Sequence, residues 1–197
     1  MITHSHLYPR INYKTEELEY LNSPGTWPLW ERIAYYIKKH DSKCLVDIGC
    51  STGAVNQFLT NYTYSYYGID QSQVLIDEAV KRWNSEHIKF ETGDWNTHQT
   101  TVNCDCLLLL GVLPYGLPEY GYSENTSPWH IYCKLIERYN PTQIIIRETC
   151  KIQNGAEIDL ATVDLAPFLE IATDVEYINV DTILGNKVLI NVTRERT

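Results

Sequence analysis

"LVDIGCSTGAVNQFL", residues 45–59, is an apolar run that reaches an aspartate and then turns through a loop containing two glycines. The pattern predicts a buried strand over 43–49, and the residues after the loop predict a helix over 53–62. A strand that leads through such a loop into a helix is typical of α/β proteins, which bind ligands beyond the carboxyl ends of their strands. Residues 45–59 therefore indicate both a fold class and a candidate ligand site.

The rest of the chain alternates between strand and helix patterns. Further strands are predicted over 64–70, 88–94, 104–111 and 143–149, and helices over 26–40, 72–84 and 127–140. A helix around 160–170 precedes two alternating strands within 176–193, which predict an antiparallel hairpin around Gly185-Asn186. The sequence thus predicts an α/β fold with a mostly parallel sheet, helices on both faces and an antiparallel edge.

Composition limits the class of protein and its partners. The 197 residues suit one domain with a sizeable core, and the net charge of −9, without a basic block, disfavours a nucleic-acid partner. No apolar run approaches the ~20 residues needed to span a membrane. The start, "MITHSHLYPRINYK", lacks the layout of a secretory signal, so we expect a cytoplasmic protein. The six cysteines include no Cys-x-x-Cys pair, and we expect reduced thiols and no metal.

A dinucleotide suits the loop poorly. A pyrophosphate site needs glycines spaced Gly-x-Gly-x-x-Gly, whereas residues 49–53 read Gly-Cys-Ser-Thr-Gly and are followed by Ala54 and Val55. Asp47 would also place a negative charge close to the phosphates. The Gly-Lys-Ser/Thr ending of a phosphate-binding loop is absent as well. A nicotinamide oxidoreductase is therefore the least favoured interpretation.

Carboxylates after three successive strands suit a cationic ligand that carries a ribose. Asp47 can attract a sulfonium or ammonium group, while the loop amides receive a carboxylate. Asp70 follows after 70 − 47 = 23 residues, close to the ~20-residue offset of ribose-binding acids, and can accept from both ribose hydroxyls. Asp94 can accept from an adenine amino group, with Trp95 or Ile69 against the ring. Taken singly, Asp70 could instead cap the next helix, and Asp94 could be an ordinary turn residue.

Over about residues 44–190 these motifs resemble those of class I S-adenosylmethionine-dependent methyltransferases. "VDIGCSTG" is similar to the family's Asp/Glu-x-Gly-x-Gly-x-Gly loop, "YYGIDQS" to its second strand, "FETGDWN" to its adenine-side segment and "CDCLLLLGVLPY" to its fourth strand. The resemblance implies a Rossmann-like, seven-stranded sheet, S-adenosylmethionine as cofactor and, without metal-binding carboxylates on the fourth strand, no magnesium. The cofactor contacts it implies are Asp47, Gly49, Cys50, Gly53, Asp70, Gln71, Asp94, Trp95 and the carbonyl near Leu110. Ser51 departs from the family's middle glycine, so the loop must accommodate a β-carbon there.

The resemblance also implies where a methyl acceptor would bind. In this family the acceptor site is formed by the N-terminal segment, the loop after the fourth strand and the end of the fifth. We therefore expect residues 1–42 to form a helical lid and residues 43–197 to form a single compact cofactor-binding domain.

Three residues near the expected acceptor site are candidates for catalysis. Tyr115 belongs to a loop rich in Tyr, Pro and Gly, and it either lines a pocket or merely packs within a lid. His130 begins the following helix and is the first candidate for a general base, the alternative being a surface histidine without a role. Glu148 follows the apolar part of the fifth strand, where Arg147 could instead neutralise it.

The sequence thus favours a methyltransferase that acts on the oxygen or nitrogen of a small molecule or natural-product intermediate by direct in-line transfer. Two alternatives stay open. One is a methyltransferase that acts on a protein, a peptide or RNA through a local patch, and the other is an inactive partner subunit that only binds S-adenosylmethionine. Nothing in the sequence names the acceptor or the oligomeric state.

Overall fold

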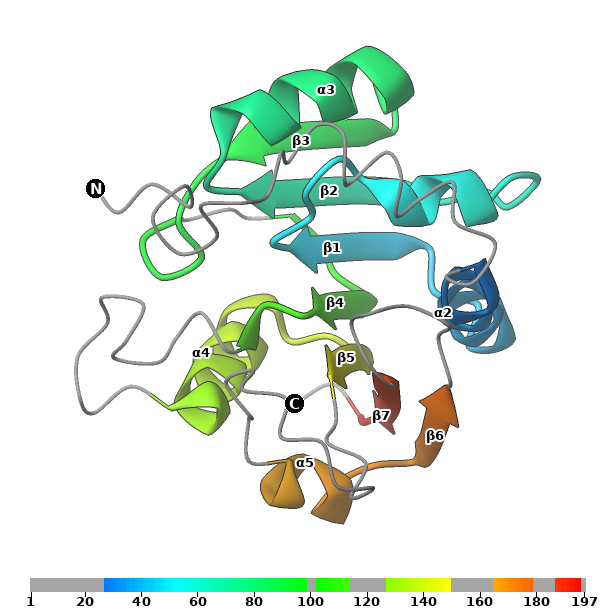
Figure 1. Ribbon diagram of the computed structural model, residues 1–197, viewed down its shortest axis with the longest axis vertical. Helices are drawn as coiled ribbons and strands as arrows, with labels where there is room; N and C mark the ends of the chain where they lie inside the picture. Colours follow the sequence, from blue (N-terminus) through cyan, green and yellow to red (C-terminus); the bar gives the residue numbers. More distant parts are fainter. Residues whose placement is uncertain (1–26, 99–101, 114–126, 150–164, 179–186, 196–197) are drawn as a thin grey trace, which may run out of the picture.

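The computed structural model describes residues 27–98, 102–113, 127–149, 165–178 and 187–195 (Figure 1). The strands are β1 (Cys44–Ile48), β2 (Ser65–Asp70), β3 (Ile88–Thr92), β4 (Cys106–Leu110), β5 (Gln143–Thr149), β6 (Asp174–Ile178) and β7 (Lys187–Thr193). The helices are α2 (Trp27–Lys39), the 3-10 helix η2 (Ala54–Phe58), α3 (Gln73–Trp83), α4 (Pro128–Tyr139) and α5 (Ala166–Glu170).

The strands form one seven-stranded sheet in the order β3-β2-β1-β4-β5-β7-β6. Strands β1 to β5 pair in parallel, whereas β7 is antiparallel to both β5 and β6. The predicted Rossmann-like fold, with a mostly parallel sheet and an antiparallel C-terminal hairpin, is therefore confirmed. The strand order reverses between β1 and β4, and open α/β sheets bind their ligands beyond the carboxyl ends of the strands at such a switch point.

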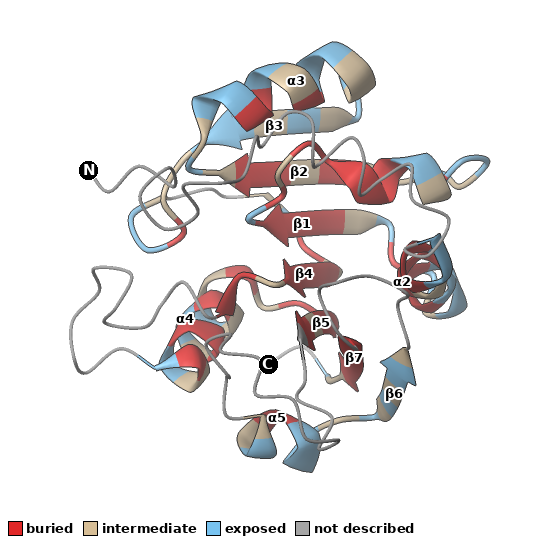
Figure 2. Cartoon of the chain, in the orientation of Figure 1, coloured by how far each residue is buried: buried red, intermediate tan, exposed pale blue. Residues whose placement is uncertain are grey.

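Two apolar clusters join the helices to opposite faces of this sheet. One cluster packs α2 and η2 against Leu45 and Leu108, and the other packs α4 and α5 against Val46 and Leu107. Because side chains alternate across a strand, neighbouring residues of β1 and β4 contribute to different clusters. All of β4 is buried, in agreement with its continuous apolar sequence (Figure 2).

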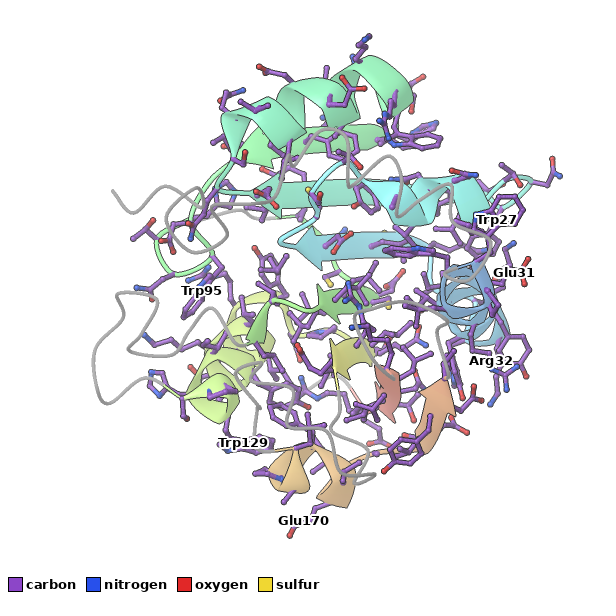
Figure 3. All side chains as sticks on the ribbon, in the orientation of Figure 1. Trp27, Glu31, Arg32, Trp95, Trp129 and Glu170 are labelled. Carbon is purple, nitrogen blue, oxygen red and sulfur yellow. The ribbon has the colours of Figure 1, made fainter. Side chains whose placement is uncertain are left out.

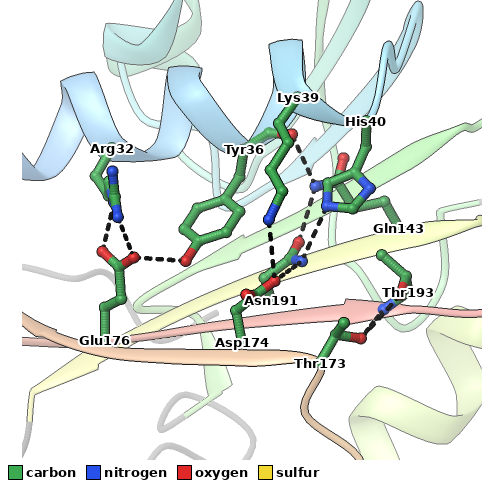
Figure 4. Close-up of polar contacts among 10 residues, drawn as sticks. All are labelled: Arg32, Tyr36, Lys39, His40, Gln143, Thr173, Asp174, Glu176, Asn191 and Thr193. Atoms are coloured by element: carbon green, nitrogen blue, oxygen red, sulfur yellow. Dashed lines mark hydrogen bonds and ion pairs between the residues drawn. The ribbon is translucent and has the colours of Figure 1, made fainter.

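Helix α2 is attached to the sheet by burial of its apolar side and by polar contacts with β5 and β6 (Figure 4). Its apolar side is buried, and Arg32 donates from Nε to Oε2 of Glu176 on β6 at 2.5 Å. The Tyr36 hydroxyl donates to the other oxygen of Glu176 at 2.7 Å, and Gln143 on β5 donates to the Tyr36 carbonyl at 3.1 Å. These contacts make α2 part of the core. Residues 1–26 lie outside the described residues, so a lid that ends at residue 42 stays a prediction.

The segment after the first loop differs from the predicted helix over 53–62. It forms only the short 3-10 helix η2, which ends at Phe58. The side chain of Asn56 donates to the Gly53 carbonyl at 2.9 Å and thus competes with the backbone bonds of an α-helix. Asn61 then adopts a left-handed conformation with φ of 62°, which stops any continuation.

The C-terminal part agrees with the predicted pattern where it is described. The antiparallel pairing of β6 with β7 confirms the two strands within 176–193, although β6 begins two residues earlier, at Asp174. Of the helix predicted around 160–170, the described part is Ala166–Glu170. The turn at Gly185-Asn186 lies outside the described residues.

Candidate cofactor-binding site

Asp47, near the end of β1, is a buried carboxyl beside the switch point. Only 3% of it is exposed, and its Oδ2 accepts from the Tyr66 hydroxyl at 2.6 Å. Its Oδ1 has no hydrogen-bond partner in the described part of the chain. Burial raises the pKa of Asp47 to about 7, and the nearby negative charge of Asp70 adds to this, whereas the Tyr66 hydrogen bond opposes it. A buried carboxyl with a partnerless oxygen is costly unless a donor or cation completes it.

The loop over 49–53 is folded back onto β2. The amides of Gly49 and Cys50 both donate to the Ile69 carbonyl, at 2.8 and 3.0 Å. Gly49 and Gly53 have φ values of 69° and 70°, and Ser51 between them has 51°. Such left-handed conformations are easy for glycine and cost other residues roughly 1–2 kcal/mol. The loop therefore accommodates the β-carbon of Ser51 in a left-handed conformation, which glycine adopts more easily.

Asp70 ends β2 and joins this loop to the start of α3. Its Oδ2 accepts from the Ser51 amide at 2.9 Å, and its Oδ1 accepts from the Ser72 amide at 2.8 Å. Ser72 is the N-cap of α3, so Asp70 bonds the amide of the cap residue and is not itself the cap. The same contacts orient the carboxylate between the loop and the helix. A carboxylate oxygen accepts more than one hydrogen bond, so this orientation is compatible with a ribose.

Asp94 and Trp95 follow β3 at the same edge of the sheet. Oδ1 of Asp94 accepts from the Asn96 amide at 2.7 Å, and Oδ2 accepts from the Gln71 side chain at 3.2 Å. Trp95 is buried, and Figure 3 shows it at the end of the sheet toward which β1, β2 and β3 point. The loop thus brings the predicted adenine-side residues next to Gln71, which follows the predicted ribose acid directly in the chain.

The end of β4 contacts Arg147, which the sequence analysis considered only as a partner of Glu148. Arg147 on β5 donates to the Leu110 carbonyl at 2.9 Å, the carbonyl predicted to face a cofactor. Gly111 follows with φ of 83°, and a β-carbon there would lie 3.1 Å from the Arg147 guanidinium. Arg147 and Glu148 are neighbours in a strand and point to opposite faces, so their side chains form no ion pair.

Glu148 is the second buried carboxyl at this edge. Only 3% of it is exposed, and its Oε1 has no hydrogen-bond partner among the described residues. Burial raises the pKa of Glu148 to about 8, against the opposing effects of the Arg147 charge, a hydrogen bond from the Leu113 backbone and the Lys187 charge. Leu113 belongs to the loop after β4, which was predicted from sequence to contact an acceptor. Glu148 therefore lies close to the start of that loop.

No described contact joins His130, another predicted catalytic residue, to Glu148 or Asp47. His130 lies exposed in the first turn of α4, and its amide donates to Oγ of Ser127 at 3.1 Å. Ser127 and Pro128 begin this helix as its sequence predicts. Tyr115 lies outside the described residues. The catalytic roles of His130, Glu148 and Tyr115 all stay predictions.

The described residues offer neither a cluster of metal ligands nor a membrane-spanning helix. They contain no group of three or more His, Cys, Asp or Glu side chains that could hold a metal ion. None of the described helices combines the length and the apolar character needed to cross a bilayer.

Comparison with known proteins defines the class of fold. No family model matches the sequence, and no curated protein matches it. Among solved structures, magnesium protoporphyrin IX methyltransferase (ChlM) from Synechocystis PCC 6803 with bound S-adenosylhomocysteine matches with a TM-score of 0.66 at 13% identity, over 87% of this chain and 84% of that one. The N-methyltransferase NodS from Bradyrhizobium japonicum WM9 matches with a TM-score of 0.63 at 16% identity, over 88% and 98% of the two chains.

The similarity extends to a protein that modifies RNA. The 16S rRNA methylase ArmA matches with a TM-score of 0.56 at 13% identity, over 98% of this chain and 92% of that one. This chain therefore has the fold of the class I S-adenosylmethionine-dependent methyltransferases. At identities this low, the structural similarity establishes the shared fold alone. The chemistry has to be argued from the residues of this chain.

Proposed function

We propose that the protein is an S-adenosylmethionine-dependent methyltransferase that acts on a small molecule by direct in-line transfer to oxygen or nitrogen. The observation that carries this proposal is the buried carboxyl of Asp47, whose Oδ1 lacks a partner at the switch point of a methyltransferase fold. A cationic ligand would complete this carboxyl and favour its ionised form. A pyrophosphate would instead meet its negative charge.

The proposed cofactor contacts follow the three strand ends. Asp47 would face the cationic end, and the loop residues Gly49, Cys50 and Gly53 would surround the amino-acid part. Asp70 would accept from the ribose hydroxyls, with Gln71 beside it. Asp94, Trp95 and the Leu110 region would enclose the adenine. When bound, the cofactor supplies an electrophilic methyl group on a sulfonium.

The chain itself would position the acceptor and, where needed, take its proton. In-line attack depends on alignment, which alone supplies a large part of the acceleration in such reactions. A base is needed when the nucleophile arrives protonated. Glu148 has a pKa raised by burial to about 8, which suits proton exchange near neutral pH. We rank Glu148 ahead of His130 because the Glu148 carboxyl is buried with one oxygen lacking a described partner, whereas His130 is exposed. Tyr115 lies outside the described residues.

Ligand-dependent thermal unfolding tests the cofactor. S-adenosylhomocysteine at ~100 times its dissociation constant should stabilise the protein by about 2.7 kcal/mol, and NAD should not. Asp70→Ala should abolish the shift because it removes the carboxylate between loop 49–53 and α3. Asp77→Ala is the matched control, since Asp77 is exposed on α3 and contacts Gln73. Stabilisation by NAD alone would contradict the proposal.

A panel of acceptors then tests the activity. Methyl transfer to small amines, phenols or carboxylic acids would support the proposed substrate class. Transfer only to RNA or protein would replace that class while leaving the cofactor unchanged. Binding of S-adenosylmethionine without any turnover would instead favour a partner subunit that lacks activity.

A further inference from the structure

Arg138, in the last turn of α4, connects this helix to the loop over residues 93–98. Its Nη1 donates to the Trp95 carbonyl at 2.5 Å, and its Nη2 donates to the Asn96 carbonyl at 3.2 Å. The two contacts use the two ends of one planar guanidinium, a geometry that fixes the position of a backbone more strictly than a single donor does. Arg138 is separated from Trp95 by 43 residues, and the sequence offers no motif that links them.

The same loop is held on its other side by β2 and β3. The ring of His98 packs on Tyr67, with Nε2 at 3.2 Å from the Tyr67 hydroxyl, and the hydroxyl also bonds to Glu91. Gly93 makes room for this ring, because a β-carbon there would lie 2.6 Å from Nδ1 of His98. Loop 93–98 is therefore held between the sheet and α4, and Arg138 makes the bidentate contact from the helix side.

Asp94 lies in this loop between Gly93 and the two residues that Arg138 contacts, Trp95 and Asn96. Its carbonyl accepts from the amides of Thr97 and His98 at 3.1 and 2.7 Å, and its side chain is oriented by Asn96 and Gln71. Movement of the Trp95 and Asn96 carbonyls would displace the Asp94 carboxylate directly, since these residues follow it in the chain. The guanidinium of Arg138 thus holds the two residues that directly follow this carboxylate in the chain.

We propose that Arg138 determines the purine specificity of the site by fixing loop 93–98, so that Asp94 meets the amino group of adenine. This inference rests on the proposed function. A fixed carboxylate accepts from the 6-amino group of adenine and repels the 6-oxo group of hypoxanthine. A carboxylate on a loose loop can move away from the oxo group, and the discrimination is lost. Arg138 acts through Asp94 and is a positioning residue.

Binding of two ligands to the full chain tests this role. The wild type should bind S-adenosylhomocysteine at least about tenfold more tightly than S-inosylhomocysteine, the analogue with hypoxanthine in place of adenine. Arg138→Ala should bring this ratio close to one, chiefly by weakening S-adenosylhomocysteine. Arg138→Lys retains the charge but loses the two-pronged contact, and it should also lower the ratio. Lys81→Ala, which removes an exposed cation from α3, should leave the ratio unchanged.

Hydrogen exchange in the absence of ligand provides a second readout. The amides of Thr97 and His98 should exchange about fivefold or more faster in Arg138→Ala than in the wild type, because the loop opens more often. The Lys81→Ala protein should exchange at the wild-type rate. Unchanged exchange together with an unchanged ligand ratio would overturn the role of Arg138. A wild type that binds neither ligand would refute the proposed function, and the exchange rates would then show separately whether Arg138 holds the loop.

Discussion

Two buried carboxyls, Asp47 and Glu148, are unusual at the scale of the residue. Each has one oxygen without a partner among the described residues, and burial raises the pKa of each well above its ordinary value. Buried polar groups usually find partners because an unsatisfied one costs about 1–3 kcal/mol. Groups perturbed in this way gather at functional sites, and both lie near the carboxyl ends of strands in this sheet.

The raised pKa of Glu148 predicts a specific dependence of stability on pH. Between pH 4.5 and about 8 the unfolded state loses the Glu148 proton while the folded state keeps it, so the free energy of unfolding falls as pH rises. The difference between these two pKa values corresponds to at most about 5 kcal/mol. Glu148→Gln removes this loss, and the variant should therefore gain stability relative to the wild type as pH rises from about 4.5 to 8.

Urea unfolding at several pH values measures this effect. Glu137→Gln is the control, because Glu137 is exposed on α4 and its replacement should leave the pH profile of the wild type intact. Parallel stability profiles for the wild type and Glu148→Gln would show that Glu148 titrates normally. The catalytic proposal for Glu148 would then lose its main support.

At the scale of the element, the attachment of α2 involves two forces of different size. Its ion pair with β6 joins Arg32 and Glu176, whose side chains are 42% and 27% exposed. Exposed pairs of this kind typically contribute about 0.2–1 kcal/mol. Ile33 is fully buried on the same helix, and its truncation leaves a cavity that typically costs 2–5 kcal/mol.

We therefore expect Ile33→Ala to destabilise the protein several times more than Arg32→Ala. Arg32→Ala should cost no more than about 1 kcal/mol, with some of that from lost packing over Tyr35. Chemical unfolding with a common m-value measures both. A larger cost for Arg32→Ala would show that the polar contacts of Figure 4, rather than the apolar side of the helix, hold α2 in place.

The elements also show what could be predicted from sequence. The start of α4 was predicted from Ser127 and Pro128, because capping is a local interaction. Strand β4 was predicted from its continuous apolar run. The prediction of a helix over 53–62 was wrong. The hydrogen bond from Asn56 to the Gly53 carbonyl and the left-handed conformation of Asn61 oppose an α-helix there.

The predicted site shows a similar division. That Asp47, Asp70 and Asp94 lie at one edge could be predicted, because the carboxyl ends of strands in a parallel sheet share that edge. Arg138 could not be found, since its contact with Trp95 depends on how α4 packs across the sheet. The partner of the Leu110 carbonyl likewise emerges only from the pairing of β4 with β5.

At the scale of the whole molecule, the net charge of −9 bears on the choice of acceptor. RNA binding requires basic side chains that replace counterions, and its affinity falls steeply with salt. We expect a labelled structured RNA to show no saturable binding between roughly 50 and 200 mM salt when measured by fluorescence anisotropy. Saturable binding whose affinity falls with a log–log slope of about −4 or steeper would reveal a local basic patch and favour an acceptor like that of an rRNA methylase.

The contact between α2 and β6 has a consequence for biosynthesis. Arg32 leaves the ribosome 144 residues before Glu176, which at typical translation rates is a delay of about ten seconds. During that interval α2 can pack on β1 and η2, which are made soon afterwards, but its outer side has no edge strand to receive it. A nascent chain that stalls before β6 would therefore expose the flank of its first described helix to chaperones and proteases.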